Sequence, residues 1–397
     1  MKHAREMQTI AVAAISARAM AEAAANEGFK VVALDLFGDI DTLRAASRWL
    51  PIGAPGSLHI DAASVLAALR QLAKEGEGGD PVVGWIAGSG FEGEPDLLQE
   101  GAAVLPLIGT APDAVRRLRD PATFFGFLAA HVMPYPQVLL QPPEDPAGWL
   151  MKDAHGCGGW HVRHAPWSMD EPPTSHHYFQ REMPGLPMSA TFIANGHDVH
   201  VLGFNEMNVR RFGTRPFVFC GAVGPVPVPE HIASRVTSIA RALTVEFELR
   251  GLCSLDFMRD GETIGVLEVN PRPPASMSLY RWPAGTPGLM QAHLRACLHG
   301  ELPSTPSRTQ GKKGAQDTED TEGIEIVFAR RPMELDAAAA RQLAAWPGVR
   351  DLPGAGQRFD IDDPLCTLTV SGTSANEVRA RLNESRERLL KSLETLA

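Results

Sequence analysis

Three residues with oxygen-bearing side chains, Asp256, Glu268 and Asn270, have the types and spacing of metal ligands on a β-hairpin. Asp256 lies in one apolar stretch, and residues 263–270 form a second strand after a turn at Gly261. Because side chains alternate between the faces of a strand, Glu268 and Asn270 share a face. Asp256 joins them if the hairpin register pairs residues of equal parity, as a loop of three or five residues would do. Two carboxylates and one amide oxygen suit Mg²⁺, which keeps waters and completes its shell with substrate phosphates.

The alternative for this stretch is an ordinary exposed hairpin with charged residues on its wet face, since the pattern D-x11-E-x-N is short. The residues that follow favour the metal site. Pro271, Pro273 and Pro274 end the strand and hold the guanidinium of Arg272 beside the cluster. At that position Arg272 is predicted to clamp a phosphate or an acyl phosphate in a fork of hydrogen bonds.

A second group of residues has the properties of a phosphate-binding loop. Lys152 ends an apolar strand and is followed by Gly156, Gly158 and Gly159. Backbone N–H groups of such a loop approach phosphates unhindered, and the lysine ammonium neutralises their charge. The sequence G-x-x-x-x-G-K-[ST] is missing, so this is no Walker A motif. The alternative is a glycine hairpin with a surface lysine.

Composition limits the classes of function. The 397 residues predict two or three domains, and 44% hydrophobic and 21% charged residues are typical of a globular chain. A net charge of −10 argues against a general binder of nucleic acid or of anionic membranes. The five cysteines include no C-x-x-C pair, which favours a reducing compartment. The N-terminus imitates a signal peptide, but Glu6 and the short apolar run favour a first strand and a cytoplasmic protein.

The N-terminal part predicts an α/β domain with a parallel sheet over residues 1–112. Residues 8–37 read as strand, helix and strand, and a helix over 61–74 and a further strand continue the pattern. Ser16 and Arg18 follow the first strand, where open α/β sheets bind ligands, so they are candidate substrate contacts. The loop 88–92 either faces a ligand or only connects two elements.

The remainder predicts a second domain over residues 113–303, with a small lobe at about 138–185, then a polar linker over 304–322 and a C-terminal α+β unit over 323–397. A helical run covers 113–131, and a long helix covers 230–250. Arg210 and Arg211 either receive an anionic substrate or face water. The C-terminal unit completes the active site, mediates homodimer formation or docks a partner.

Taken in order, the strand lysine with its glycine loop, a Q-x-E segment before Pro184-Gly185, and the D…E-x-N-P-R stretch resemble the ATP-grasp superfamily of carboxylate–amine ligases. The resemblance covers residues 1–300 and implies an ATP-grasp fold with an N-terminal pre-grasp domain and a two-lobed ATP clamp. Residues 185–206, CGAVGPV and VLEVNPRPPASMSL are also similar to a branch linked to one-carbon metabolism of the methanofuran and methylofuran type. That branch includes the ligase that joins tyramine to glutamate.

The resemblance implies roles for individual residues. Lys152 would contact the ATP phosphates beneath a flap of Gly156, Gly158 and Gly159, and Arg272 would steady the acyl phosphate. One or two Mg²⁺ ions, or Mn²⁺ in their place, would be held by the hairpin ligands Asp256, Glu268 and Asn270. The adenine would be held by the four residues of the hinge segment, Gln180, Arg181, Glu182 and Met183.

Two departures from the family pattern bear on this assignment. The acidic residue that many relatives place after the hinge glycine to bind ribose is Leu186 or Pro187 here. The first phosphate-side lysine of the family is also missing, and in that stretch either Arg119 substitutes or nothing does.

The sequence thus predicts an ATP- and Mg²⁺-dependent ligase that joins the carboxylate of an amino acid such as glutamate to the amine of a cofactor precursor. The predicted partners are small-molecule substrates, without nucleic acid or membrane. Two alternatives stay open: an ATP-grasp ligase of another small-molecule or peptide pathway, and a non-catalytic ATP-binding regulator. The intact set of Asp256, Glu268, Asn270 and Arg272 argues against the regulator.

Overall fold

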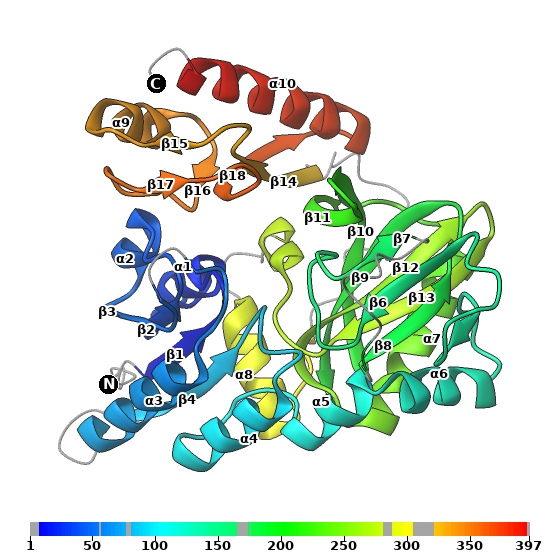
Figure 1. The fold of residues 1–397 in the computed structure, drawn as a ribbon. Helices are drawn as coiled ribbons and strands as arrows, with labels where there is room; N and C mark the ends of the chain where they lie inside the picture. The colour runs from blue at the N-terminus through cyan, green and yellow to red at the C-terminus, as the bar shows by residue number, and fades with distance from the viewer. Residues whose placement is uncertain are drawn as a thin grey trace, which may run out of the picture.

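A computed structural model gives the fold, and the described residues are 8–54, 57–76, 81–164, 174, 176–280, 288–304 and 321–394. Most of the predicted linker over 304–322 lies outside these residues. Figure 1 shows an N-terminal α/β part, a large sheet with a smaller sheet in front of it, and a C-terminal part above the N-terminal one.

The N-terminal part contains a four-stranded parallel sheet in the order β3-β2-β1-β4, as predicted. Its strands are β1 (Thr9–Ala13), β2 (Lys30–Asp35), β3 (Arg48–Pro51) and β4 (Val82–Ala87), and its helices are α1 (Arg18–Asn26), α2 (Ile40–Ala45), α3 (Ala62–Gly76) and α4 (Pro95–Val104). β1 is buried on both faces. Ile10 and Val12 pack in one cluster with α1, whereas Ala11 and Ala13 pack in another with α3 and α4.

The predicted helical run over 113–131 is two helices, α5 (Pro112–Arg119) and α6 (Pro121–Ala130). The break follows from the sequence, because Pro121 has no N–H to continue the first helix. Asp120 caps the second helix, and its carboxylate accepts a hydrogen bond of 2.8 Å from the backbone N–H of Thr123. The break places Arg119 at the last residue of α5, from which its side chain reaches the large sheet.

The small lobe is a four-stranded antiparallel sheet in the order β5-β8-β6-β7. Its strands are β5 (Val138–Leu139), β6 (Trp149–Asp153), β7 (Arg163–His164) and β8 (His177–Arg181). Trp149, Met151 and Phe179 form its apolar core. Lys152 follows Met151 on β6, and because neighbouring side chains of a strand point to opposite faces, it points away from that core.

The large sheet has eight strands in the order β13-β12-β9-β10-β11-β14-β18-β16. The first five are β9 (Leu186–Asn195), β10 (Val199–Phe212), β11 (Arg215–Gly224), β12 (Arg250–Asp260) and β13 (Thr263–Asn270). The helix α7 (Glu230–Phe247) packs on β9 and β10. Its buried face carries Ile232, Val236, Ile239, Leu243 and Phe247 at helical spacing. Each such side chain stabilises the fold by about 1.5–3 kcal/mol when fully buried.

The C-terminal unit continues the large sheet. It contributes β14 (Thr321–Phe328), β16 (Val349–Arg350) and β18 (Pro364–Gly372), together with a two-stranded sheet of β15 (Met333–Glu334) and β17 (Arg358–Phe359). β14 pairs antiparallel with β11, so the unit is joined to the second domain by backbone hydrogen bonds. The helices α9 (Ala337–Ala345) and α10 (Ala375–Glu394) complete it, and α10 packs on β14 and β18.

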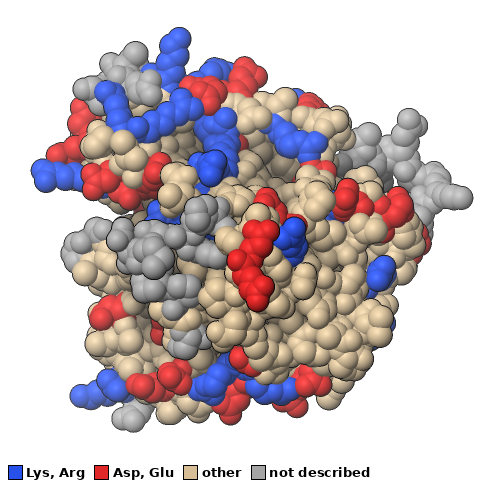
Figure 2. Space-filling view, turned by 45° about the vertical axis from the view of Figure 1, so that its right-hand side comes forward, with Lys and Arg blue, Asp and Glu red and all other residues tan. Residues whose placement is uncertain are grey.

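The surface and the helices bear on the expected partners. On the face drawn in Figure 2, acidic and basic side chains are interspersed, and basic ones are most frequent near the top, where the C-terminal unit lies. Among the described residues, no helix combines the length and the apolar character that crossing a bilayer requires.

Candidate active site

The hairpin of β12 and β13 reaches the predicted arrangement by a different route from the one expected. Its turn has two residues, since Asp260 pairs with Thr263, and this turn alone does not give the pairing of equal parity that a loop of three or five residues would give. A β-bulge at Leu267 supplies the missing residue: four steps along β12, from Asp260 to Asp256, match five along β13. The bulge restores the register and places Asp256 opposite Glu268.

The three predicted ligands lie together at this end of the hairpin. The amide nitrogen of Asn270 donates a hydrogen bond of 3.0 Å to a carboxylate oxygen of Asp256, and both residues are buried. Burial and the neighbouring Glu268 carboxylate raise the pKa of Asp256. Burial would also raise the pKa of Glu268, but Arg119 and Lys152 outweigh it and hold that carboxyl ionised. The two carboxylates repel each other, so a cation bound between them would be stabilised.

The donor set fits a hard divalent cation. Within the part of the chain that the structure describes, no three His, Cys, Asp or Glu side chains gather at metal-binding spacing. The cluster instead offers two carboxylates and one amide oxygen, a set that suits Mg²⁺ or Mn²⁺ with waters and phosphates as further ligands. A zinc site of nitrogen and sulfur ligands is not what these residues would form.

Arg119 lies directly against this cluster. Its Nη1 is 3.3 Å from Glu268 Oε2 and its Nη2 is 3.5 Å from Asn270 Oδ1, although the side chain comes from α5. The side chain is 9% exposed, and its Nε has no acceptor among the described residues. Arg119 is thus a buried guanidinium with an unused donor, and it lies beside a cluster suited to a metal and phosphates. It fits the role of the missing phosphate-side lysine, for which the sequence offered Arg119 or nothing as the substitute.

Lys152 faces the same space from β6. Its ammonium donates a hydrogen bond of 3.2 Å to Gln180 Oε1 and lies 5.8 Å from the centroid of the Tyr178 ring. Burial would lower the pKa of Lys152, but Tyr178 and Glu268 outweigh it and keep the ammonium charged. The amide nitrogen of Gln180 is buried and has no acceptor among the described residues. The small lobe therefore presents one cation and one free donor.

The glycine loop after β6 lies on β11. Gly158 and Gly159 have φ of +61° and +77°, which L side chains rarely adopt. A Cβ on Gly159 would lie 1.9 Å from the carbonyl oxygen of Phe217, so the backbones meet too closely for any side chain. A Cβ on Gly156 would meet the imidazole of His161 at 2.2 Å. Gly156 and Gly159 are thus needed for close packing of the loop, and its approach to phosphates stays a prediction.

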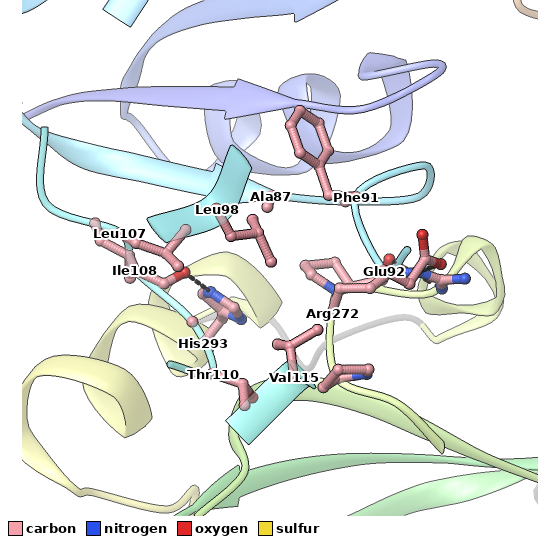
Figure 3. A pocket seen from close by; sticks show the side chains of 14 residues that line it. Ala87, Phe91, Glu92, Leu98, Leu107, Ile108, Thr110, Val115, Arg272 and His293 are labelled. Atoms are coloured by element: carbon pink, nitrogen blue, oxygen red, sulfur yellow. Dashed lines mark hydrogen bonds and ion pairs between the residues drawn. The ribbon is translucent and has the colours of Figure 1, made fainter. Parts of the chain in front are cut away.

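Arg272 is held by a residue of the N-terminal part. Its Nε donates a hydrogen bond of 2.5 Å to Glu92 Oε1, and the Glu92 side chain is only 1% exposed. Figure 3 shows the two side chains at one end of a small cavity whose other end is lined by His293. Sequence reasoning left the loop of Glu92 as a connection or a ligand-facing loop. The sequence shows only a glutamate in a Gly-rich segment, which does not identify Arg272 as its partner.

Comparison with known proteins agrees with this geometry. Residues 120–276 match the model of the ATP-grasp domain. The chain resembles N5-carboxyaminoimidazole ribonucleotide synthetase in its ADP complex (TM-score 0.67, 14% identity, 98% of both chains covered). It also resembles the L-amino acid ligase of Bacillus licheniformis (TM-score 0.65, 17% identity, 96% of this chain and 97% of that one covered). The fold is the ATP-grasp fold.

Two further relatives belong to the same set. The biotin carboxylase of Campylobacter jejuni, solved with an ATP complex, has a TM-score of 0.69 and 13% identity over 97% of this chain and 95% of that one. The large chain of carbamoyl phosphate synthase from Pseudomonas syringae pv. tomato is 25% identical over 194 residues, which are 43% of this chain and 18% of that protein. The chain thus spans less than a fifth of that relative's length.

The predicted fold class is confirmed, with its N-terminal parallel sheet and its antiparallel sheets. The match to an ATP-grasp domain and the ligases among the neighbours support the prediction of an ATP-dependent carboxylate–amine ligase. The finer resemblance to methanofuran-type ligases stays a prediction.

The hinge of the ATP-grasp domain, residues 180–183, links the small lobe to β9. The backbone N–H of Arg181 donates to Gln137 O at 2.8 Å, and that of Glu182 donates to Gly148 O at 3.0 Å. Met183 packs against Gly265, where a Cβ would lie 2.5 Å from its sulfur. Leu186 is 40% exposed and offers no acid to a ribose, as its sequence implied.

Three of the four predicted substrate residues contact the C-terminal unit. Ser16 Oγ and Arg18 Nε donate to Asp351 Oδ1 at 3.0 and 2.9 Å, and Arg210 forms an ion pair with the buried Glu325. The fourth, Arg211, is exposed on β10. The structure therefore gives three of them a carboxylate partner within the chain, and their contact with substrate stays a prediction.

Proposed function

We propose that the protein is an ATP- and Mg²⁺-dependent ligase that activates a carboxylate as an acyl phosphate and joins it to an amine. The proposal rests on one observation: beside Asp256 and Asn270, the Glu268 carboxylate lies 3.3 Å from Arg119, and the charges of Lys152 and Arg272 also stabilise its ionised form. Positioning and stabilisation of negative charge are what phosphoryl transfer requires.

Different residues would bind the metal and the phosphates. Asp256, Glu268 and Asn270 would hold Mg²⁺, which when bound supplies charge neutralisation between the ATP phosphates. Lys152 and Arg119 would neutralise the phosphate oxygens from two sides, and the glycine loop would exclude water from them.

Arg272 would steady the carboxylate and the acyl phosphate made from it. In the first step the γ-phosphoryl moves from ATP to a carboxylate oxygen and ADP leaves. In the second step the amine nitrogen attacks the acyl carbon, and phosphate leaves with the electrons of the broken C–O bond.

Glutamate and an amine of a methanofuran-type cofactor are the substrates that the sequence resemblance favours, and an amine such as tyramine is the first to test. The L-amino acid ligase among the structural neighbours favours a second candidate, a ligase that joins amino acids. A cytoplasmic location, small-molecule partners and a homodimer belong to this proposal as predictions from the sequence.

Release of ADP and phosphate with Mg²⁺-ATP and glutamate tests the proposal, with amines that include tyramine and amino acids added one at a time. We expect release that depends on both substrates and is lost in Glu268→Ala. Glu262→Ala is the matched control, because Glu262 lies in the turn of the same hairpin and is exposed. Tight ATP binding without turnover across the panel would instead favour the regulator.

A further inference from the structure

The contact between Glu92 and Arg272 joins the N-terminal domain to the reacting end of the proposed site. Glu92 follows β4 in the loop 88–93, whereas Arg272 follows β13, so 180 positions of sequence separate them. We propose that Glu92 is a positioning residue that fixes the guanidinium of Arg272 for the acyl phosphate. This inference rests on the proposed ligase function.

Both oxygens of Glu92 are already used. Oε1 accepts from Arg272 Nε at 2.5 Å, and Oε2 accepts from the backbone N–H of Gly90 at 2.6 Å. Burial would raise the pKa of Glu92, but Arg272 and Arg119 outweigh it, and the pKa lies below its usual range. The carboxylate keeps lone pairs that neither donor uses, but its side chain is only 1% exposed, so little of it is accessible to a substrate ammonium. It holds its partner in place.

The contact leaves the outer edge of Arg272 for the substrate. Of the described residues, only Glu92 and the carbonyl of Pro273, at 3.5 Å from Nη1, accept hydrogen bonds from this guanidinium. The Nε–H bond fixes the plane of the planar group, and Nη2 stays open to a phosphate oxygen. The adjacent cavity of about 20 Å³ has room for only about one water molecule, so the guanidinium cannot move into it.

The loop of Glu92 also touches the glycine flap. A Cβ on Gly93 would lie 2.1 Å from the carbonyl oxygen of His155, the residue before Gly156. The same loop therefore contacts Arg272 through Glu92 and the flap through Gly93. A displaced loop would misplace both at once, and a displacement of about 1 Å in such a site costs about a hundredfold in rate.

A substitution by glutamine separates positioning from packing. Glutamine has nearly the shape of glutamate but only one acceptor oxygen, so it cannot accept from both Arg272 and Gly90. We expect Glu92→Gln to lower kcat by about ten- to a hundredfold, with the Kd for ATP changed less than about twofold. Glu94→Gln is the matched control, because Glu94 lies two residues further along the chain and is exposed, and this variant should keep the rate of the unchanged protein.

A double-mutant cycle with Arg272→Ala identifies the route of the effect. If Glu92 acts through Arg272, Glu92→Gln adds no further loss once Arg272 is alanine. Losses that multiply, or a Glu92→Gln protein with unchanged kcat, would overturn the proposal. Should Glu92→Gln not fold, Glu92→Asp enters the same cycle, because it keeps the charge and both oxygens but is one methylene shorter.

A measurement without turnover keeps this inference separate from the proposed function. The Nε–H of Arg272, assigned by NMR from its loss in Arg272→Lys, should exchange slowly with water in the unchanged protein and rapidly in Glu92→Gln. Equal exchange in both would refute the positioning contact even if ligase activity is found. Absence of ADP release with protected exchange would refute only the choice of reaction.

Discussion

Removal of the guanidinium of Arg119 tests the phosphate side of the site most directly. In Arg119→Ala the cluster of Glu268 and Asn270 loses a cation whose nitrogens lie 3.3 and 3.5 Å from their oxygens. When ATP is bound, we expect this guanidinium to turn its donors, including the unused Nε, toward the phosphates.

The size of the effect follows from these contacts. A hydrogen bond to a charged group contributes about 1.5–3 kcal/mol, and a factor of ten in Kd corresponds to about 1.4 kcal/mol. Arg119→Ala should therefore weaken ATP binding by about ten- to a hundredfold. Arg119→Lys, which keeps the charge but loses the fork, should lie between the two proteins.

Titration calorimetry with Mg²⁺-ATP measures the change. Arg117→Ala is the matched control, since Arg117 lies on the same helix but is 47% exposed and pairs with Glu246. Its affinity for ATP should equal that of the unchanged protein. If Arg119→Ala binds ATP as tightly as Arg117→Ala does, Arg119 is not a phosphate ligand and the account of the site given above is wrong.

Three further predictions concern stability, the flap and the metal. Burial and the carboxylates of Asp351, Asp35 and Asp41, against one opposing Arg18, raise the pKa of Asp39 from 3.8 to about 8. The folded protein then holds a proton that the unfolded chain has released, so stability falls as pH rises from 4 to 8. Thermal denaturation should show Asp39→Asn gaining stability over the unchanged protein at pH 8 but little at pH 4, and parallel curves would contradict this. Gly159→Ala should weaken ATP binding about tenfold through its φ of +77° and its contact with Phe217 O, whereas Gly126→Ala, which meets nothing, should not. Chelation by EDTA should abolish ADP release and added Mg²⁺ or Mn²⁺ should restore it; release that survives chelation would exclude the metal site.

The ligand residues of the hairpin could be predicted because strand alternation is a local rule. Glu268 and Asn270 are two positions apart and had to share a face. The bulge at Leu267 could not be predicted, because an apolar residue that forms the extra position of a bulge does not differ in type from its neighbours in the strand. The shared face of the ligands was thus predicted, whereas the bulge that produces the register was not.

Contacts between distant segments were beyond the sequence. Arg18 and Arg210 looked free to meet a substrate, but Asp351 and Glu325, each more than a hundred positions away, pair with them. Glu92 stayed unassigned for the same reason, since its partner Arg272 lies in another domain. A single sequence shows the type of a charged residue but not the partner that a fold brings to it.

The pairing of β14 with β11 has a consequence for synthesis of the chain. β11 ends at Gly224 and its neighbour β14 begins at Thr321, so the edge of β11 stays unpaired while about a hundred further residues leave the ribosome. An open strand edge is a template for other chains. The sheet can therefore be completed only after nearly the whole polypeptide has been synthesised. Chains that end before β14 should aggregate more than the full chain.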